Sequence, residues 1–168
     1  YEPASLVVEA DAALSGMTVA VSDLEGDGAK LPASMIDVFW VKRWWQADHK
    51  LHNSNDPQLV PELLLKDSEL VTVSPDVESH RNTIRSPRVD APTLQPVDVA
   101  AGDNQQVWLT AHVPADAKAG TYRGAVKLSF ANAPPVRVPL TVTVHPFALL
   151  ESKWDSSLYY NGRLKEFP

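Results

Sequence analysis

Three consecutive segments between Gln105 and Pro146 alternate apolar and polar residues with a period of two, and this pattern constrains the fold more than any other feature. Each segment is bounded by proline or glycine. The third shows the pattern most regularly, with five apolar residues on one face: Val136, Val138, Leu140, Val142 and Val144. Because successive side chains of a strand point to opposite faces, the pattern predicts antiparallel strands of a half-buried sheet. The stretch carries no catalytic motif, so it predicts an architecture and not a reaction.

The rest of the chain predicts further short strands, at Ser5–Ala10, Met17–Leu24 and Met35–Ala47. The last of these, MIDVFWVKRWWQA, is apolar on both faces, which indicates a central strand or one covered by another domain. Within Val60–Asp67, a short helix beginning at Pro61 and an extended segment are equally compatible with the residues. Residues 74–96 are polar and rich in proline, so we expect a long surface excursion there.

About eight short strands without a long amphipathic helix predict an all-β fold, an Ig-like antiparallel β-sandwich. We assign residues 1–147 to the sandwich domain. Residues 148–168 lack alternation although they contain Trp154, Tyr159 and Tyr160. This segment is expected to be a linker or the start of a following catalytic domain, and the two tyrosines and Trp154 are candidate ligand or interface residues.

Composition excludes several classes of protein. The 168 residues are 44% hydrophobic with a net charge of -6, which suits one well-buried core and argues against a nucleic-acid partner. There is no cysteine, hence no disulfide or thiolate metal site. Apolar runs fall far short of the ~20 residues of a membrane helix, so no membrane insertion is expected. The start at Tyr1 shows no signal-peptide pattern and is expected to be a processed or trimmed end.

The charged residues give no strong catalytic or metal motif. Glu25–Gly28 lacks the spacing of a calcium loop and favours a hairpin turn. His49 and His52 have metal-like spacing without the rest of a zinc motif, and a polar loop is favoured. Four carboxylate pairs lie in or beside turns and favour solvated surface over acid–base chemistry: Asp23/Glu25, Asp67/Glu69, Asp76/Glu78 and Asp98/Asp103. We therefore expect no catalytic residue, metal or cofactor in this chain.

Aromatic residues are the better candidates for a binding surface. A tryptophan ring stacks on the apolar face of a sugar, and four tryptophans with Arg43 could form such a platform: Trp40, Trp44, Trp45 and Trp108. The alternative, which we favour, is that they pack in the core or against a neighbouring domain. Trp108 shares its face with Thr110 and His112 and is the residue expected to meet a neighbouring domain.

Several segments together resemble a known family. They are Trp44–Ala47 (WWQA), Val60–Asp67 (VPELLLKD), Val107–Pro114 (VWLTAHVP), Ala119–Gly124 (AGTYRG) and Val144–Phe147 (VHPF). This set, spanning about residues 35–168, is similar to the N-terminal β-sandwich domain of glycoside hydrolase family 123-like proteins, many of them bacterial domains of unknown function. Val60–Asp67 is the most specific part.

The resemblance implies a sandwich that leads into a (β/α) barrel which hydrolyses glycosidic bonds. In characterised members an Asp-Glu pair of the barrel supports attack by the substrate's own N-acetyl group, and no position of this chain can receive that pair. The resemblance thus implies a non-catalytic accessory domain of a bacterial polysaccharide-degrading enzyme, periplasmic or extracellular, with the barrel as its partner in cis or on a second chain. An independent carbohydrate-binding module and an Ig-like structural or adhesion module remain the alternatives.

Overall fold

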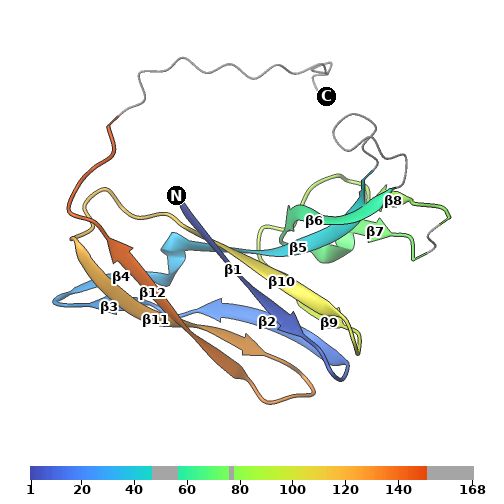
Figure 1. Cartoon of the computed structure of the whole chain (residues 1–168), viewed down its shortest axis with the longest axis horizontal. Coiled ribbons are helices and arrows are strands. Elements are labelled where there is room, and N and C mark those ends of the chain that lie inside the picture. Colours follow the sequence, from blue (N-terminus) through green and yellow to red (C-terminus); the bar gives the residue numbers. More distant parts are fainter. Residues whose placement is uncertain (47–56, 76–77, 151–168) are drawn as a thin grey trace.

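The computed structural model describes residues 1–46, 57–75 and 78–150. These residues form an almost entirely β structure with two single-turn 3-10 helices, η1 (Ala33–Met35) and η2 (Ser68–Leu70). Figure 1 shows two layers of strands and, beside them, a smaller group formed by β6, β7 and β8. The predicted all-β sandwich is confirmed. Of the segment expected to lead toward a barrel, residues 151–168 lie outside the described part of the chain.

One layer is a four-stranded sheet in which every neighbouring pair is antiparallel. Its strands, in spatial order, are β1 (Glu2–Glu9), β10 (Asn104–Ala111), β5 (Ile36–Gln46) and β6 (Gln58–Leu65). The aromatic strand β5 therefore has a neighbour on each side, as its two apolar faces predicted. Its first half belongs to the sandwich and its second half, beyond Lys42, pairs with β6 alone among the described strands.

The other layer contains six strands. They are β4 (Ala29–Leu31), β3 (Leu24–Gly26), β11 (Gly120–Ser129), β2 (Leu14–Val21), β9 (Val97–Val99) and β12 (Val136–Val144), with β12 paired to β11. β3 and β4 form the hairpin that Glu25–Gly28 predicted. A separate two-stranded sheet joins β7 (Val71–Val73) to β8 (Asn82–Ile84).

The three alternating segments are all strands, but they do not form one sheet. β10 pairs with β1 and β5, whereas β11 and β12 pair in the opposite layer. Their apolar faces meet across the core: Val107 and Leu109 come from one layer, Tyr122 and Val126 from the other. The prediction of one sheet is wrong, because alternation shows which face of a strand is buried and carries no information about its lateral partner.

The segment Val60–Asp67 is extended and not helical. Its first six residues belong to β6, and the register against β5 shifts between Lys42 and Arg43, which face Leu63 and Pro61. Glu62 is thus the extra residue of a β-bulge. Pro61 is accommodated because β6 is an edge strand, where proline is tolerated.

Three edge strands of the sandwich and its extension contain a proline: Pro3 in β1, Pro61 in β6 and Pro139 in β12. The direction of the third follows from its partner. Ala125, which faces Pro139, exchanges hydrogen bonds with Ser22 on its other side, at 2.9 and 3.0 Å. The N–H and C=O groups of Ala125 thus point away from β12. In an antiparallel pair the nitrogen and the C=O group of the facing residue, Pro139, then point away from β11, toward the open edge of the sheet.

The core lies between the two layers and is centred on side chains that are completely enclosed. Trp40, Met17, Leu24 and Val107 are all at 0% exposure. The Tyr122 ring packs among them, and its hydroxyl donates to the Lys118 carbonyl oxygen at 2.8 Å. A second, much smaller cluster of Leu65, Leu70 and Val71 lies between β6, η2 and β7. We call residues 58–96 the lobe.

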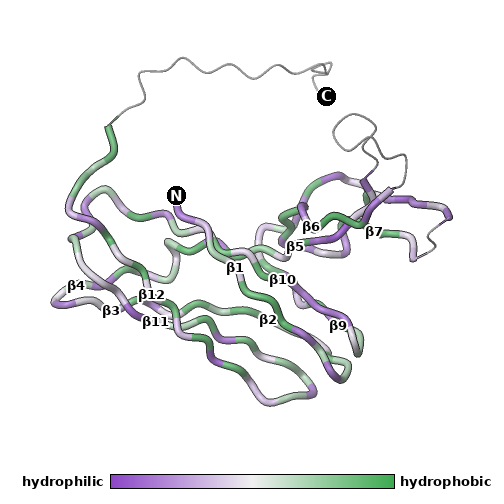
Figure 2. Tube along the Cα trace, in the orientation of Figure 1, coloured by the Kyte–Doolittle hydropathy of each residue, from purple (hydrophilic) through white to green (hydrophobic). Residues whose placement is uncertain are grey.

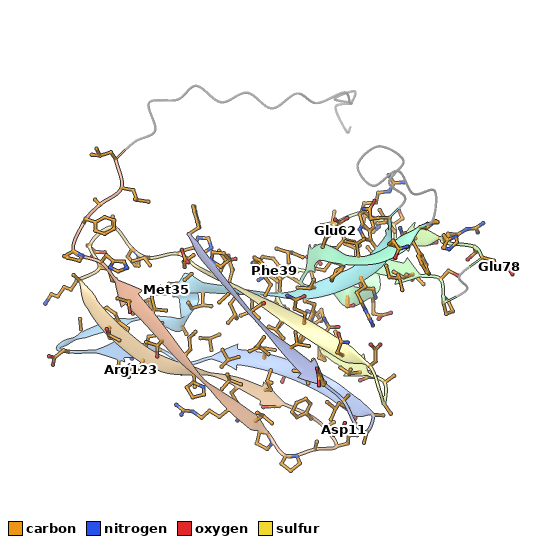
Figure 3. The ribbon with its side chains drawn as sticks, viewed as in Figure 1. Asp11, Met35, Phe39, Glu62, Glu78 and Arg123 are labelled. Atoms are coloured by element: carbon orange, nitrogen blue, oxygen red, sulfur yellow. The ribbon has the colours of Figure 1, made fainter. Side chains whose placement is uncertain are left out.

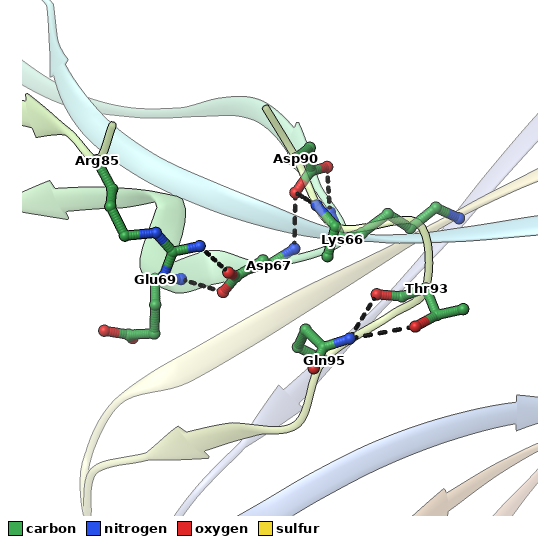
Figure 4. A network of polar contacts seen from close by, with 8 residues as sticks. Lys66, Asp67, Glu69, Arg85, Asp90, Thr93 and Gln95 are labelled. Carbon is green, nitrogen blue, oxygen red and sulfur yellow. Dashed lines mark hydrogen bonds and ion pairs between the residues drawn. The ribbon is translucent and has the colours of Figure 1, made fainter. Parts of the chain in front are cut away.

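The lobe is fastened by polar contacts (Figure 4). The Asp90 carboxylate accepts hydrogen bonds from the N–H groups of Lys66, Asp67 and Ala91, at 2.7, 2.9 and 2.9 Å. Gln95 joins the lobe to the sandwich: its N–H donates to the Lys66 carbonyl oxygen, and its own carbonyl accepts from the Trp40 indole. The predicted surface excursion of residues 74–96 is thus held to the rest of the chain by Asp90 and Gln95, among other contacts.

Candidate functional site

The three tryptophans of β5 lie in different surroundings. Trp40 is in the core, and its Nε1 donates to the Gln95 carbonyl oxygen at 2.7 Å. Neither face of its ring is open to a ligand, which removes Trp40 from the candidate sugar platform. The cause is its position in the first half of β5, where the opposite layer covers the strand.

Trp45 is half-buried against the lobe. Its Nε1 donates to the Ser74 carbonyl oxygen at 3.0 Å, and the His80 ring meets it edge to face at 4.6 Å. The Asn82 side chain exchanges two hydrogen bonds with the backbone of Trp45, at 3.0 and 2.8 Å. The Asn82 amide thus makes the two hydrogen bonds that the backbone of a neighbouring strand would make, and this contact attaches β8 to β5.

Trp44 is half-buried at the bulge of β6. Its Nε1 donates to Glu62 Oε1 at 2.6 Å, and the Gln46 amide donates to the same oxygen. Figure 3 shows Glu62 on β6, near the end of the lobe. An indole, a carboxylate and an amide are therefore brought together at a partly open position, which is chemically suited to sugar hydroxyls.

The two cations of β5 are both engaged. Arg43 Nη2 lies 2.6 and 2.8 Å from the two carboxylate oxygens of Asp103. The hydrogen bond from the Asn104 N–H, followed by the Arg43 guanidinium, holds the pKa of Asp103 below its ordinary value. Lys42 Nζ donates to Ser68 Oγ at 3.1 Å, and burial lowers its pKa. These groups line a polar cleft of about 900 Å³ between the lobe and the start of β10.

Trp108 lies on the outer face of the four-stranded sheet, beside Phe39 on β5 and Ser5 on β1. It is half-buried, and its Nε1 contacts Thr110 Oγ1 at 3.2 Å. That its face meets a neighbouring domain stays a prediction. Trp154, Tyr159 and Tyr160 lie outside the described residues.

A row of charges on the same sheet was missed by the sequence interpretation. Lys66 Nζ lies 3.9 Å from the centroid of the Phe39 ring and 3.6 Å from Asp37 Oδ1. The other Asp37 oxygen is 3.2 Å from His112 Nε2, and the Tyr1 ring meets His112 edge to face at 4.4 Å. The partners are far apart in the chain, so no local spacing could have shown them.

Three of the candidate carboxylates make contacts that support the fold, whereas Asp76 lies outside the described residues. Asp23 contacts Lys30 at 2.6 Å and accepts from the Ala33 N–H, and these bonds lower its pKa. Asp67 binds Arg85 and accepts from the Glu69 N–H at 2.9 Å, which lowers its pKa too. Asp98 accepts from the Gly16 N–H at 2.7 Å. In each case the acidic group orders a turn, a cap or a strand end.

Metal ligands and membrane spans can be assessed for the described part of the chain. Within residues 1–46, 57–75 and 78–150, no three His, Asp or Glu side chains gather as a metal site would require. In those same ranges no helix is long and apolar enough to cross a membrane. His49 and His52 lie outside them.

An apolar cleft of about 600 Å³ opens between β1 and β12, at the end where β12 finishes. Its floor is made by Ile36, Leu109 and Ala111 of the core, and one wall by Leu140 and Val142. Phe147 and Leu149, beyond the last strand, lie at its mouth. The predicted domain boundary at residue 147 stays a prediction. The chain carries exposed apolar side chains at this point, those of Phe147, Leu149 and Leu150.

The fold and these contacts define an all-β sandwich domain whose charged groups mainly support its own architecture. The family model for the glycoside hydrolase 123 N-terminal domain matches residues 3–130, and the chain belongs to this family.

Among solved structures, the chain is similar to a family 123 glycoside hydrolase from Clostridium perfringens studied for glycolipid glycan hydrolysis. The TM-score is 0.60 at 12% sequence identity, and the match covers 85% of this chain. It covers 20% of that enzyme, so the likeness concerns the fold of one part of a much longer protein. No curated protein matches the chain.

Proposed function

We propose that this chain is the non-catalytic, Ig-like accessory domain of a bacterial glycoside hydrolase that acts on a polysaccharide outside the cytoplasm, and that it braces a catalytic (β/α) barrel. The family match and the 20% coverage of the Clostridium enzyme support a domain joined to a larger one. The Tyr122 hydroxyl contact with Lys118, near the start of β11, is of the kind found in Ig-type sandwiches.

The observation that carries the proposal is that three carboxylates are bound by groups of the domain itself. Glycoside hydrolysis needs two carboxyl groups facing a substrate across a cleft. Here Asp23, Asp67 and Asp103 are held by cations and backbone N–H groups, each with a lowered pKa. Groups fixed as anions in this way suit structure better than proton transfer at neutral pH.

The test compares three proteins: the full-length gene product, the 168-residue chain, and the gene product without residues 1–150. We expect glycosidase activity in the first and none in the second. The third should lose thermal stability, because a domain that binds the folded barrel stabilises it. Hydrolysis by the 168-residue chain itself would contradict the proposal.

A second candidate, a carbohydrate-binding module, is favoured by the contact of Trp44 with Glu62 and Gln46. Binding of the chain to insoluble polysaccharides, compared with Trp44→Ala and with Trp108→Ala as the control, tests it. Loss of binding in Trp44→Ala alone would support this function. Equal retention of all three proteins, or of none, would leave bracing as the function.

A further inference from the structure

Large exposed apolar side chains gather at one end of the sandwich, while others are spread over the sandwich and the lobe, as Val7, Val136 and Ile84 are. Five lie at this one end: Tyr1 at 92% exposure, Val113 at 39%, Phe147 at 68%, Leu149 at 89% and Leu150 at 92%. In Figure 2 the chain is hydrophilic where it turns after β12 and is then coloured as hydrophobic over the last described residues. A contiguous apolar surface of this kind marks an interaction site more often than single exposed residues do.

The same end is where the core is open. Ile36, Leu109 and Ala111 are buried core residues, and they also form the floor of the 600 Å³ cleft. Toward the middle of the sandwich, by contrast, Met17, Trp40 and Val107 are sealed at 0% exposure. An open cleft above a finished core offers apolar area to a partner without any rearrangement of the core.

The cleft is more apolar than polar, although Thr141 and Thr143 add hydroxyl groups to its lining. Glu2 and His145 are its ionisable lining side chains apart from the terminal residue Tyr1. Pro3 and Pro139 interrupt the two flanking strands, and Pro139 points its backbone to the open edge. A partner is therefore held by apolar side chains entering the cleft and not by adding a strand to either edge.

The position of the chain identifies the partner. The described chain leaves the sandwich at this end, through Phe147 to Leu150, and residues 151–168 follow. The catalytic domain of the proposed function is thus joined to the sandwich at the end that carries the cleft, and such a link gives it a high effective concentration there. The outer face of the four-stranded sheet is less suited, because its Lys66, Asp37 and His112 are already paired with one another.

We propose that the cleft between β1 and β12, together with Phe147 and Leu149, is the docking surface for the catalytic domain of the same polypeptide. This inference rests on the proposed function and specifies the face through which the sandwich braces the barrel. The docked side chains of the catalytic domain cover Phe147 and Leu149 and close the cleft over Ala111 and Val142.

The test uses the double variant Phe147→Ala/Leu149→Ala in the full-length enzyme and in the 168-residue chain. In the full-length enzyme we expect the sandwich to unfold at a midpoint at least about 4 °C lower. In the 168-residue chain the midpoint should stay within about 1 °C, because both side chains are exposed there. Scanning calorimetry measures both. The matched control Ile84→Ala/Val89→Ala removes exposed apolar side chains from the lobe and should change neither protein.

A second measurement uses an apolar fluorescent dye. The 168-residue chain should bind it, the double variant should bind several-fold less, and the full-length enzyme should bind little. An active full-length enzyme that is unaffected by the double variant would overturn the docking surface while leaving the proposed function intact. An inactive full-length protein would instead contradict the proposed function.

Two other occupants are distinguished by the same proteins. Dimerisation of the 168-residue chain in sedimentation experiments, abolished by the double variant, would assign the cleft to a second copy and overturn the proposal. Dye binding that appears only after residues 151–168 are removed would assign the cleft to that segment and overturn it as well.

Discussion

The sandwich and the lobe are joined through strand β5, which pairs with β6, but they are stabilised in different ways. Among the described residues, the sandwich core contains fourteen buried residues between two layers, whereas the cluster of the lobe contains three. The lobe compensates with directed polar contacts, above all those of Asp90, Asp67 and Asn82. A large core is stabilised by apolar area, which depends little on pH, while a polar lobe depends on the ionisation of a few groups. The two regions should therefore respond differently to the same perturbation.

The largest effect is expected from Trp40→Ala. It removes the biggest enclosed side chain and the hydrogen bond to Gln95, so the free energy of unfolding should fall by about 3–5 kcal/mol. Urea denaturation of the 168-residue chain measures it. Trp45→Ala is the matched variant, because Trp45 is on the same strand but half-buried against the lobe. It should lower the free energy of unfolding by less than half as much. Equal losses would remove the distinction between the two regions.

The next effect is expected from Asp90→Ala. It leaves the N–H groups of Lys66, Asp67 and Ala91 without their acceptor, at a cost of about 2–3 kcal/mol. Hydrogen exchange should accelerate across β6 to β8 and stay slow in β11. Asp98→Ala is the control, because Asp98 accepts a single N–H at an exposed position. Exchange that accelerates uniformly through both regions would show that the lobe has no independent stability.

Acid should loosen the lobe before the sandwich. The Arg85 guanidinium, and then the Glu69 N–H, lower the pKa of Asp67 in the folded chain. A lowered folded pKa contributes stability that is fully present above the unfolded value of about 4 and is lost as pH falls through the folded value. Hydrogen exchange of β7 and β8, measured from about pH 5 down to about pH 2, follows this loss of stability. Asp67→Asn should be less stable at pH 7 and show a flatter profile. A profile identical to that of the parent chain would exclude Asp67 as the cause.

The smallest effect is expected from Arg43→Gln. The Arg43–Asp103 pair is about two-fifths exposed on both sides, so its loss should cost less than about 1 kcal/mol, and the difference should shrink at high salt. Denaturation in low and high salt checks this. A larger, salt-independent cost would place this pair with the structural contacts of the lobe.

Alternation predicted the strands well but not their neighbours. β10 and β11 have the expected buried faces, with Val107, Tyr122 and Val126 inside, whereas the apolar face of β12 is only partly buried and its Val136 is exposed. The separation of β10 from the other two depends on the pairing of β10 with β1, which joins the start of the chain to residues 104–111. Such pairing is set by the packing of the whole core, and no short sequence pattern indicates it.

The candidate site shows the same limit more sharply. Composition indicated that the tryptophans mattered, yet Trp40, Trp44 and Trp45 lie on one strand with three different roles. Their roles differ because the opposite layer covers only the first half of β5, where Trp40 lies, and because the bulge at Glu62 lies beside the second half. The exposed apolar end around Phe147 was not predicted either, since an exposed residue and a buried one look alike in sequence.

The edge prolines have a consequence for the time before a partner domain has folded. A newly made sandwich exposes long, apolar strand edges, and such edges normally recruit other chains into intermolecular β-structure. Pro139 removes a donor from the outward edge of β12, and Pro3 and Pro61 place prolines in the edge strands β1 and β6. The domain can thus keep a sticky apolar cleft open for its partner while denying other copies a template for fibril growth.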